Sequence, residues 1–86
     1  MPRISEFFGI IISMYYNEHA PPHFHAIYGE FKVSILIENL GILEGRLPPK
    51  ALSLVIEWAD LHQEELRKNW DLLKEHKPLF KIEPLK

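Results

Sequence analysis

The sequence predicts an α+β domain in which an antiparallel sheet of three or four strands is covered on one face by a long C-terminal helix. Two observations indicate this class. Residues 7–47 contain short runs of β-branched and aromatic residues separated by glycine and proline, and residues 51–77 repeat apolar side chains at spacings of three and four. With 86 residues, of which 47% are hydrophobic, residues 1–86 are expected to form one small domain.

The strands are predicted from composition and alternation. Residues 7–16 are β-branched and aromatic and show no helical period, which favours one long first strand. Residues 24–28 and 31–38 form the next two strands, and Gly29 between them suits a tight turn. Residues 42–47 are either a short fourth strand or an extended segment that leads into the helix.

The helix is predicted to begin at the proline pair 48–49, because proline is tolerated in the first turn. Pro78 ends the helix, and a bend near residues 62–64 would divide it into two. Residues 79–85 alternate well enough to add an edge strand, a position in which Pro84 is tolerated.

Composition disfavours several classes of protein. The chain has no cysteine, so it can form neither a disulfide framework nor a thiolate zinc site. The absence of cysteine also fits a reducing cytoplasm, which is the expected location. No run approaches the roughly 20 apolar residues of a membrane span, and the N-terminal residues do not resemble a signal peptide. The formal net charge of −2 and the scattered lysines and arginines do not indicate nucleic-acid binding, which usually requires a basic face.

The strongest candidate for a functional site is a cluster of histidines. Three of the five histidines fall in one short segment, Glu18-His19-Ala20-Pro21-Pro22-His23-Phe24-His25. Because side chains two residues apart share one face of a strand, His23 and His25 are expected to be neighbours about 7 Å apart at the backbone. Phe24 and Ala26 would then point into the core. This pair is the centre of every chemical interpretation of the segment.

The cluster is compatible with a metal site, with metal-free catalysis or with a structural role. His19, His23 and His25 could together bind a divalent metal such as zinc with one open coordination position. Without metal, His23 and His25 could act as general acid and base in cleavage of a phosphoester such as RNA, and Glu18 is a further catalytic candidate. In the structural interpretation, Glu18 hydrogen-bonds a neighbouring histidine and fixes the loop.

The phosphoester hypothesis needs groups that bind the substrate. Lys32 or Arg46 could stabilise phosphate charge, and Tyr16 or Tyr28 could position the substrate. The remaining histidines are assigned structural roles. Trp58, His62 and Trp70 recur on one side of the helix and are typical of a packed face, and His76 suits the negative end of the helix.

The residues from Asn17 to Ala26, with the helix phrase Glu57-Trp58-Ala59 and the later Asn69-Trp70, resemble a small bacterial family, the domain of unknown function numbered 4160. Positions matching its signature are Glu18, His19, Pro21, Pro22, His23 and His25. The resemblance covers nearly the whole chain and implies a compact α+β protein of the prokaryotic cytoplasm. Members resemble small proteins often encoded beside another short protein, which implies a toxin–antitoxin-like pair.

Two functions from different classes follow. The first is an interaction module of such a pair, which binds a small protein partner or a second copy of itself through an exposed apolar patch or an edge strand, for example around Ile82. The alternative is a His-centred phosphoesterase or ribonuclease, metal-dependent or not. It requires His19, His23 and His25 to converge at a pocket.

Overall fold

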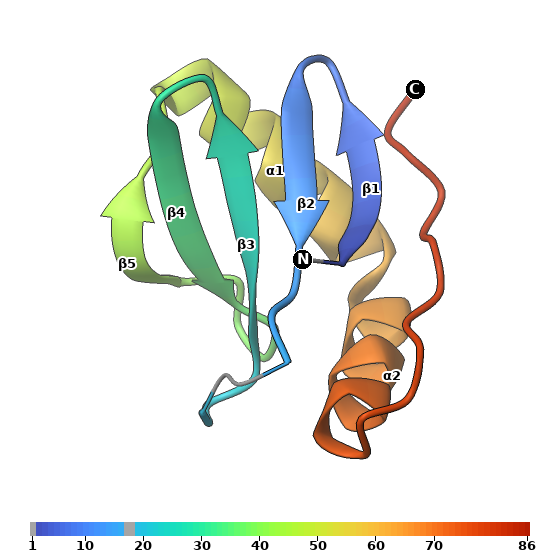
Figure 1. Ribbon diagram of the computed structural model, residues 1–86. Coiled ribbons are helices and arrows are strands. Elements are labelled where there is room, and N and C mark those ends of the chain that lie inside the picture. The colour runs from blue at the N-terminus through green and yellow to red at the C-terminus, as the bar shows by residue number, and fades with distance from the viewer. Residues whose placement is uncertain (1, 17–18) are drawn as a thin grey trace.

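The computed structural model describes residues 2–16 and 19–86. Its elements are β1 (Arg3–Phe7), β2 (Ile10–Ser13), β3 (His23–Tyr28), β4 (Phe31–Leu36), β5 (Ile42–Arg46), α1 (Pro49–Leu61) and α2 (Gln63–Lys74). The strands form one antiparallel sheet in the order of the sequence, and α1 crosses one face of it (Figure 1). The α+β class is therefore confirmed, with five strands and two helices in place of three or four strands and one long helix.

The extra strand arises because residues 7–16 do not form one strand. Phe8 and Gly9 have φ angles of 50° and 79°, and the chain reverses there so that Phe7 pairs with Ile10. Two-residue hairpin loops of this kind normally contain Asn-Gly or Asp-Gly, because both positions require positive φ. A phenylalanine at the first position gives no turn signal, so the sequence pattern predicts a continuous strand.

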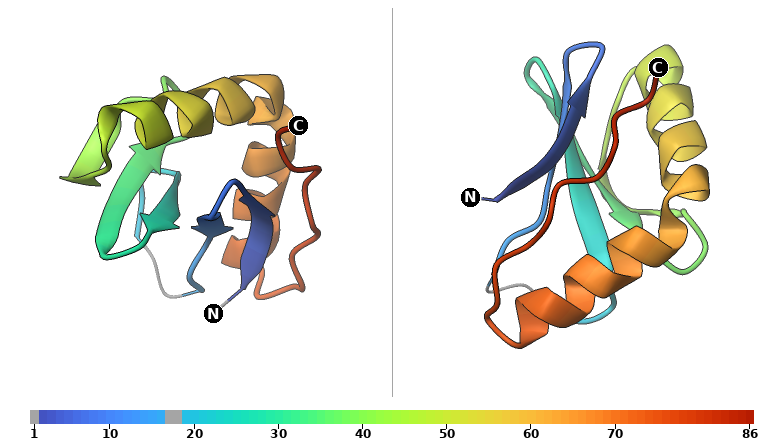
Figure 2. Two further views of the ribbon diagram at one scale, coloured as in Figure 1. Left: turned by 90° about the horizontal axis from the view of Figure 1, so that it is seen from above. Right: turned by 90° about the vertical axis from the view of Figure 1, so that its right-hand side faces the viewer.

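The helix breaks at His62, whose φ of −122° and ψ of 27° lie outside the helical region. The bend that the sequence allowed near residues 62–64 is therefore real, and both views in Figure 2 show the change of direction between α1 and α2. At the break, the Gln63 side-chain amide donates to the carbonyl oxygens of Ile37 (2.7 Å) and Glu38 (3.0 Å). This contact ties the start of α2 to the segment after β4.

The core lies between the sheet and the two helices. Trp58 of α1 is fully buried and packs on Phe7 and Phe24, with ring centroids 5.4 Å and 5.9 Å away. Phe24 and Ala26 are completely buried on this face, as the sequence predicts. In the described part of the chain, no helix is both long and apolar enough to cross a membrane.

The prediction of an edge strand at residues 79–85 is wrong, since residues 75–86 are described and contain no strand. They return along β1 as an irregular tail, visible in Figures 1 and 2. The Ile82 N–H donates to the Ile4 carbonyl oxygen (2.7 Å), but the Asn69 side chain, not a strand, satisfies the backbone groups of Phe80. Ile82 is only 3% exposed, so the expectation that it offers a binding patch is also wrong.

Candidate functional site

His23 and His25 lie side by side on β3, in the middle of the sheet. Their ring centroids are 5.2 Å apart with an interplanar angle of 73°, and the residues are 5% and 6% exposed. Phe24 between them faces α1, so His25 points to the opposite face of the sheet. There the Tyr15 ring packs against His25 at 4.4 Å, whereas the His23 ring contacts Trp70 of α2 at 5.4 Å.

The hydrogen bonds orient both rings. His23 Nδ1 lies 2.8 Å from the Pro21 carbonyl oxygen, which can only accept, so Nδ1 carries the hydrogen. In the neutral ring, the lone pair is then on Nε2. Histidines that bind metals commonly hold the same kind of bond from their other ring nitrogen. His25 Nδ1 lies 3.1 Å from Ser34 Oγ, where either atom can donate.

Two serines that the sequence analysis did not single out flank His25. In the strand register, Ser13 of β2 and Ser34 of β4 each pair directly with His25. All three residues are buried, and Ser13 Oγ has no hydrogen-bond partner among the residues that the structure describes. Their position in mainly apolar strands is the one sequence signal that could have singled out these serines. Their pairing with His25 depends on the register between strands, which the sequence pattern does not give.

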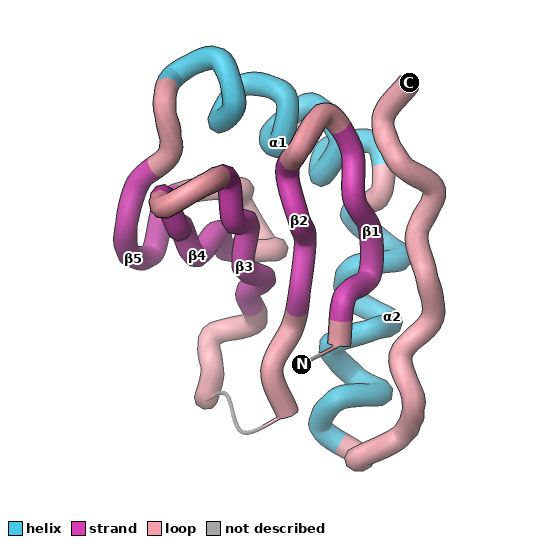
Figure 3. Tube along the Cα trace, turned by 45° about the horizontal axis from the view of Figure 1, so that its top comes forward, coloured by secondary structure: helices cyan, strands magenta, loops and turns pink. Residues whose placement is uncertain are grey.

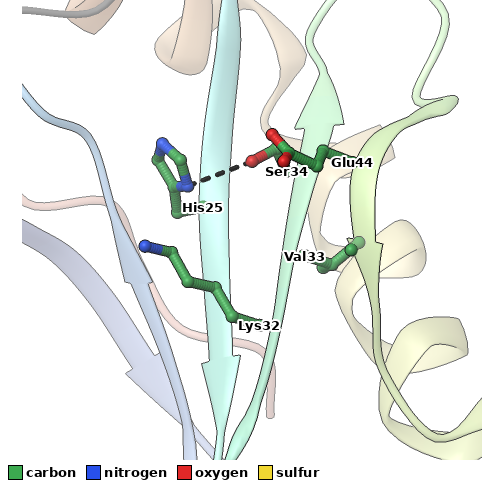
Figure 4. A pocket seen from close by; sticks show the side chains of 6 residues that line it. His25, Lys32, Val33, Ser34 and Glu44 are labelled. Atoms are coloured by element: carbon green, nitrogen blue, oxygen red, sulfur yellow. Dashed lines mark hydrogen bonds between the residues drawn. The ribbon is translucent and has the colours of Figure 1, made fainter.

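A pocket of about 220 Å³ opens beside His25. We call it the histidine pocket, and it is lined by His25, Lys32, Val33, Ser34, Glu44 and Gly45 (Figure 4). The Lys32 ammonium lies over the Tyr15 ring, 5.0 Å from its centroid. The pocket therefore combines a buried imidazole and hydroxyl with one side chain of each charge.

The other predicted site residues lie elsewhere or outside the description. Glu18 falls outside the described residues, so its catalytic and structural hypotheses stay predictions. His19 is exposed, and within residues 2–16 and 19–86 no three histidine or carboxylate side chains are placed to hold one metal ion. The structure thus brings together His23 and His25 but does not add His19 to them.

Of the four residues considered for substrate binding, Lys32 lines the histidine pocket. The Tyr16 hydroxyl donates to the Lys77 carbonyl oxygen at 2.8 Å, and the Arg46 guanidinium lies over the Phe31 ring at 5.5 Å. Tyr28 lies at the far end of β3, in the other surface described below.

The histidines of the helical region have structural contacts. His62 Nδ1 lies 2.5 Å from a Glu65 carboxylate oxygen and its ring lies 5.6 Å from the Trp58 ring, which agrees with the structural role assigned to this residue. The exposed His76 stacks on the Tyr16 ring with centroids 6.3 Å apart. Trp58 and Trp70 are buried, as the helical spacing predicts.

A second surface lies where the β1–β2 and β3–β4 turns come close to the start of α1 (Figures 1 and 3). A hollow of about 240 Å³, which we call the hairpin-tip surface, is lined there by Phe8, Ile10, Tyr28, Pro48, Lys50, Ala51 and Leu54. Phe8 is 60% exposed and Tyr28 39% exposed. Lys50 is the one charged residue among those seven, so the surface is mainly apolar.

Comparison with known proteins identifies the family but no close relative. The family model described as Domain of unknown function (DUF4160) matches residues 9–71, which span β2 to most of α2 and include both histidines of β3. Searches of curated proteins and of solved structures found no match. Most of the chain, with its central fold and its histidine pair, is thus covered by one family model, and the chain belongs to the DUF4160 family.

Proposed function

We propose that the protein is an interaction module that binds a small protein partner, as one member of a toxin–antitoxin-like pair. The observation that supports this proposal is the presentation of Phe8 at the tip of the β1–β2 hairpin. The side chain is 60% exposed on a backbone with φ of 50°. The toxin–antitoxin setting is drawn from the family resemblance, and the binding role from this surface.

The conformation of Phe8 is unfavourable for the isolated fold. A left-handed conformation costs an ordinary residue roughly 1–2 kcal/mol, which asparagine or glycine would largely avoid. The ring makes an edge contact with Phe7 at 6.4 Å, but most of its surface is open to solvent. Exposed aromatic side chains that can be buried by a partner are the residues that most often dominate binding energy.

The surface has a hollow beside Phe8 in addition to the exposed Phe8 ring. Tyr28 and Leu54 form part of its wall, so a partner that buries Phe8 can insert an apolar side chain of its own there. Lys50 at the same hollow favours a partner segment that carries a carboxylate next to that side chain. Contiguous exposed apolar surface of this kind typically marks a binding site.

The open edge of the sheet at β5 supports the proposal less well. Ile42 and Leu43 are 50% and 44% exposed there. However, the register with β4 shifts between Ser34 and Ile35, and Gly45 has φ of 81°. Such irregularities interrupt the ladder and are a common protection of edge strands against pairing.

The proposal predicts that a second short protein is encoded beside this one, and the test is co-expression with that protein, followed by co-purification and affinity measurement. Phe8→Asn keeps a residue suited to the turn and removes the ring, so we expect at least a roughly tenfold loss of affinity. Leu61→Gln is the matched control, because Leu61 is 66% exposed on α1 and does not line the hollow. Unchanged affinity of the Phe8→Asn variant would refute the proposed surface.

The His-centred phosphoesterase or ribonuclease is the second candidate, and the adjacency of His23 and His25 with Lys32 nearby supports it. Its metal-dependent form would use His19, His23 and His25 to bind zinc or a similar ion. We expect His23→Ala and His25→Ala to abolish RNA cleavage and, in the metal-dependent form, to lower zinc content of the purified protein. Full-length RNA that stays intact with wild-type protein, with and without added metal, would remove this candidate.

A further inference from the structure

The histidine pocket has walls from three strands. β3 contributes His25, β4 contributes Lys32, Val33 and Ser34, and β5 contributes Glu44 and Gly45. Figure 4 shows Lys32 and His25 extending to the same side of the sheet, with the Ser34 hydroxyl bonded to the imidazole. The pocket therefore has a buried floor formed by an imidazole and a hydroxyl, with two exposed charged residues beside it.

Gly45 keeps one wall of this pocket free of a side chain. A Cβ built at this position would lie 2.2 Å from the Lys32 carbonyl oxygen, and the φ of 81° disfavours any other residue. The backbones of β4 and β5 therefore approach closely at this point. Glu44, the residue before it, is held opposite Ser34 by the strand register.

The two charged side chains of the pocket, Lys32 and Glu44, have no ion-pair partner among the residues that the structure describes. The Lys32 ammonium is directed onto the face of the Tyr15 ring, a weak attraction that limits its freedom. A lysine and a glutamate thus line one pocket, and they form no ion pair with each other.

We propose that the histidine pocket binds a small zwitterion, an α-amino acid or a molecule with that head group, whose carboxylate meets Lys32 and whose ammonium meets Glu44. A simple anion such as phosphate is attracted by Lys32 but repelled by Glu44, and a simple cation experiences the reverse. A zwitterion is favoured by both side chains at once, because its two charges match theirs.

The size and floor of the pocket agree with such a ligand. A volume of about 220 Å³ is below the roughly 300–1,000 Å³ of pockets that hold drug-sized ligands, so a molecule of few heavy atoms fits. The buried hydroxyl of Ser34 at the floor of the pocket can donate or accept a hydrogen bond and carries no formal charge. The histidine pocket shares no lining residue with the hairpin-tip surface, so binding of the zwitterion requires no protein partner.

The test is an NMR titration of the full chain at fixed pH and ionic strength, read from the His25 Cε1–H and the Ser34 amide signals. The probes are L-alanine, acetate, methylammonium and inorganic phosphate. We expect L-alanine to cause saturable shifts at these residues, with a Kd at least about tenfold lower than that of acetate or methylammonium. Each half-ligand lacks one of the two charges, so it keeps one of the two attractions.

Four variants separate the contributions of the charges. Lys32→Met and Glu44→Gln should each weaken L-alanine binding about tenfold, and Glu44→Gln should leave acetate binding no weaker. Lys68→Met and Glu64→Gln, at exposed positions of α2 outside the pocket, are the matched controls and should change nothing. Both pocket substitutions replace exposed side chains, so they should leave the fold intact, which the amide spectrum verifies.

Three results would overturn the inference. The first is equal affinity for L-alanine and acetate, and the second is tighter binding of phosphate, which would instead favour the phosphoester site. The third is the absence of a saturable shift at His25 up to the solubility limit of the amino acid. Since the partner-binding proposal is tested by co-purification and Phe8→Asn, failure of one leaves the other standing.

Discussion

The left-handed conformation of Phe8 predicts an unusual stability order among variants at this position. Phe8→Ala and Phe8→Asn both remove the ring, its edge contact with Phe7 and the 40% of its surface that the fold covers. These losses are nearly the same in the two variants, so they cancel in the comparison. The remaining difference is how well each new residue tolerates a φ of 50°.

The size of that difference can be worked from residue preferences. Asparagine is several-fold enriched at positive φ relative to ordinary residues, and a several-fold preference corresponds to about 1 kcal/mol. Although alanine is the better helix and strand residue, Phe8→Asn should therefore unfold with a free energy about 1 kcal/mol higher than Phe8→Ala. For a domain of this size the melting temperatures should differ by about 4–8 °C.

The assay is urea unfolding at 25 °C followed by circular dichroism, with thermal melts as a second measurement. Equal m-values for the two variants establish that the comparison concerns stability and not a change in the unfolded chain. If Phe8→Asn is no more stable than Phe8→Ala, residue 8 does not hold a left-handed conformation in solution. In that case the left-handed turn does not form in solution, and it no longer supports a binding role for Phe8.

Three further substitutions test other parts of the structure, each by urea unfolding. Asn69→Leu should lower the free energy of unfolding by about 2–3 kcal/mol, because it leaves both backbone groups of Phe80 without their side-chain partner. A loss below about 1 kcal/mol would contradict a stabilising role of these two hydrogen bonds. Gly45→Ala should lower the free energy of unfolding by about 2 kcal/mol or more and raise the rate of amide exchange in β5, because the new Cβ would clash with the Lys32 carbonyl oxygen. Unchanged amide exchange in β5 would disprove the close approach of the two backbones. Ser13→Ala should leave the free energy of unfolding unchanged or raise it by about 1 kcal/mol, because it removes a buried hydroxyl that has no partner among the described residues. Clear destabilisation would show that the hydroxyl does have a hydrogen-bond partner.

The parts of the fold with local sequence signals were predictable. Alternation and the turn at Gly29 predicted β3 and β4, and the proline pair 48–49 predicted the start of α1. The β1–β2 hairpin was not predictable from composition, because Phe8 occupies a position where the usual turn residues are Asn, Asp or Gly. Ile82 was misjudged because its burial depends on a tail contacting the first strand, which no local pattern encodes.

The residues of the candidate site also divide into those that a local sequence pattern predicts and those that it does not. The period of two along a strand places His23 next to His25, and the structure agrees. Ser34 and Glu44 reach His25 through the registers of β3 with β4 and of β4 with β5. Those registers depend on the whole sheet, so residues far apart in the sequence join the pocket without any motif that links them.

The tail that lies along β1 covers one edge of the sheet. Ile82 bonds to Ile4, and the Glu83 carbonyl accepts from the Trp58 indole, so residues 79–86 contact both the first strand and the centre of the core. Detachment of these residues would leave the outer edge of β1 as a row of unpaired backbone groups. A local opening of the tail, with the rest of the sheet intact, is therefore enough to make β1 a site for pairing with another chain.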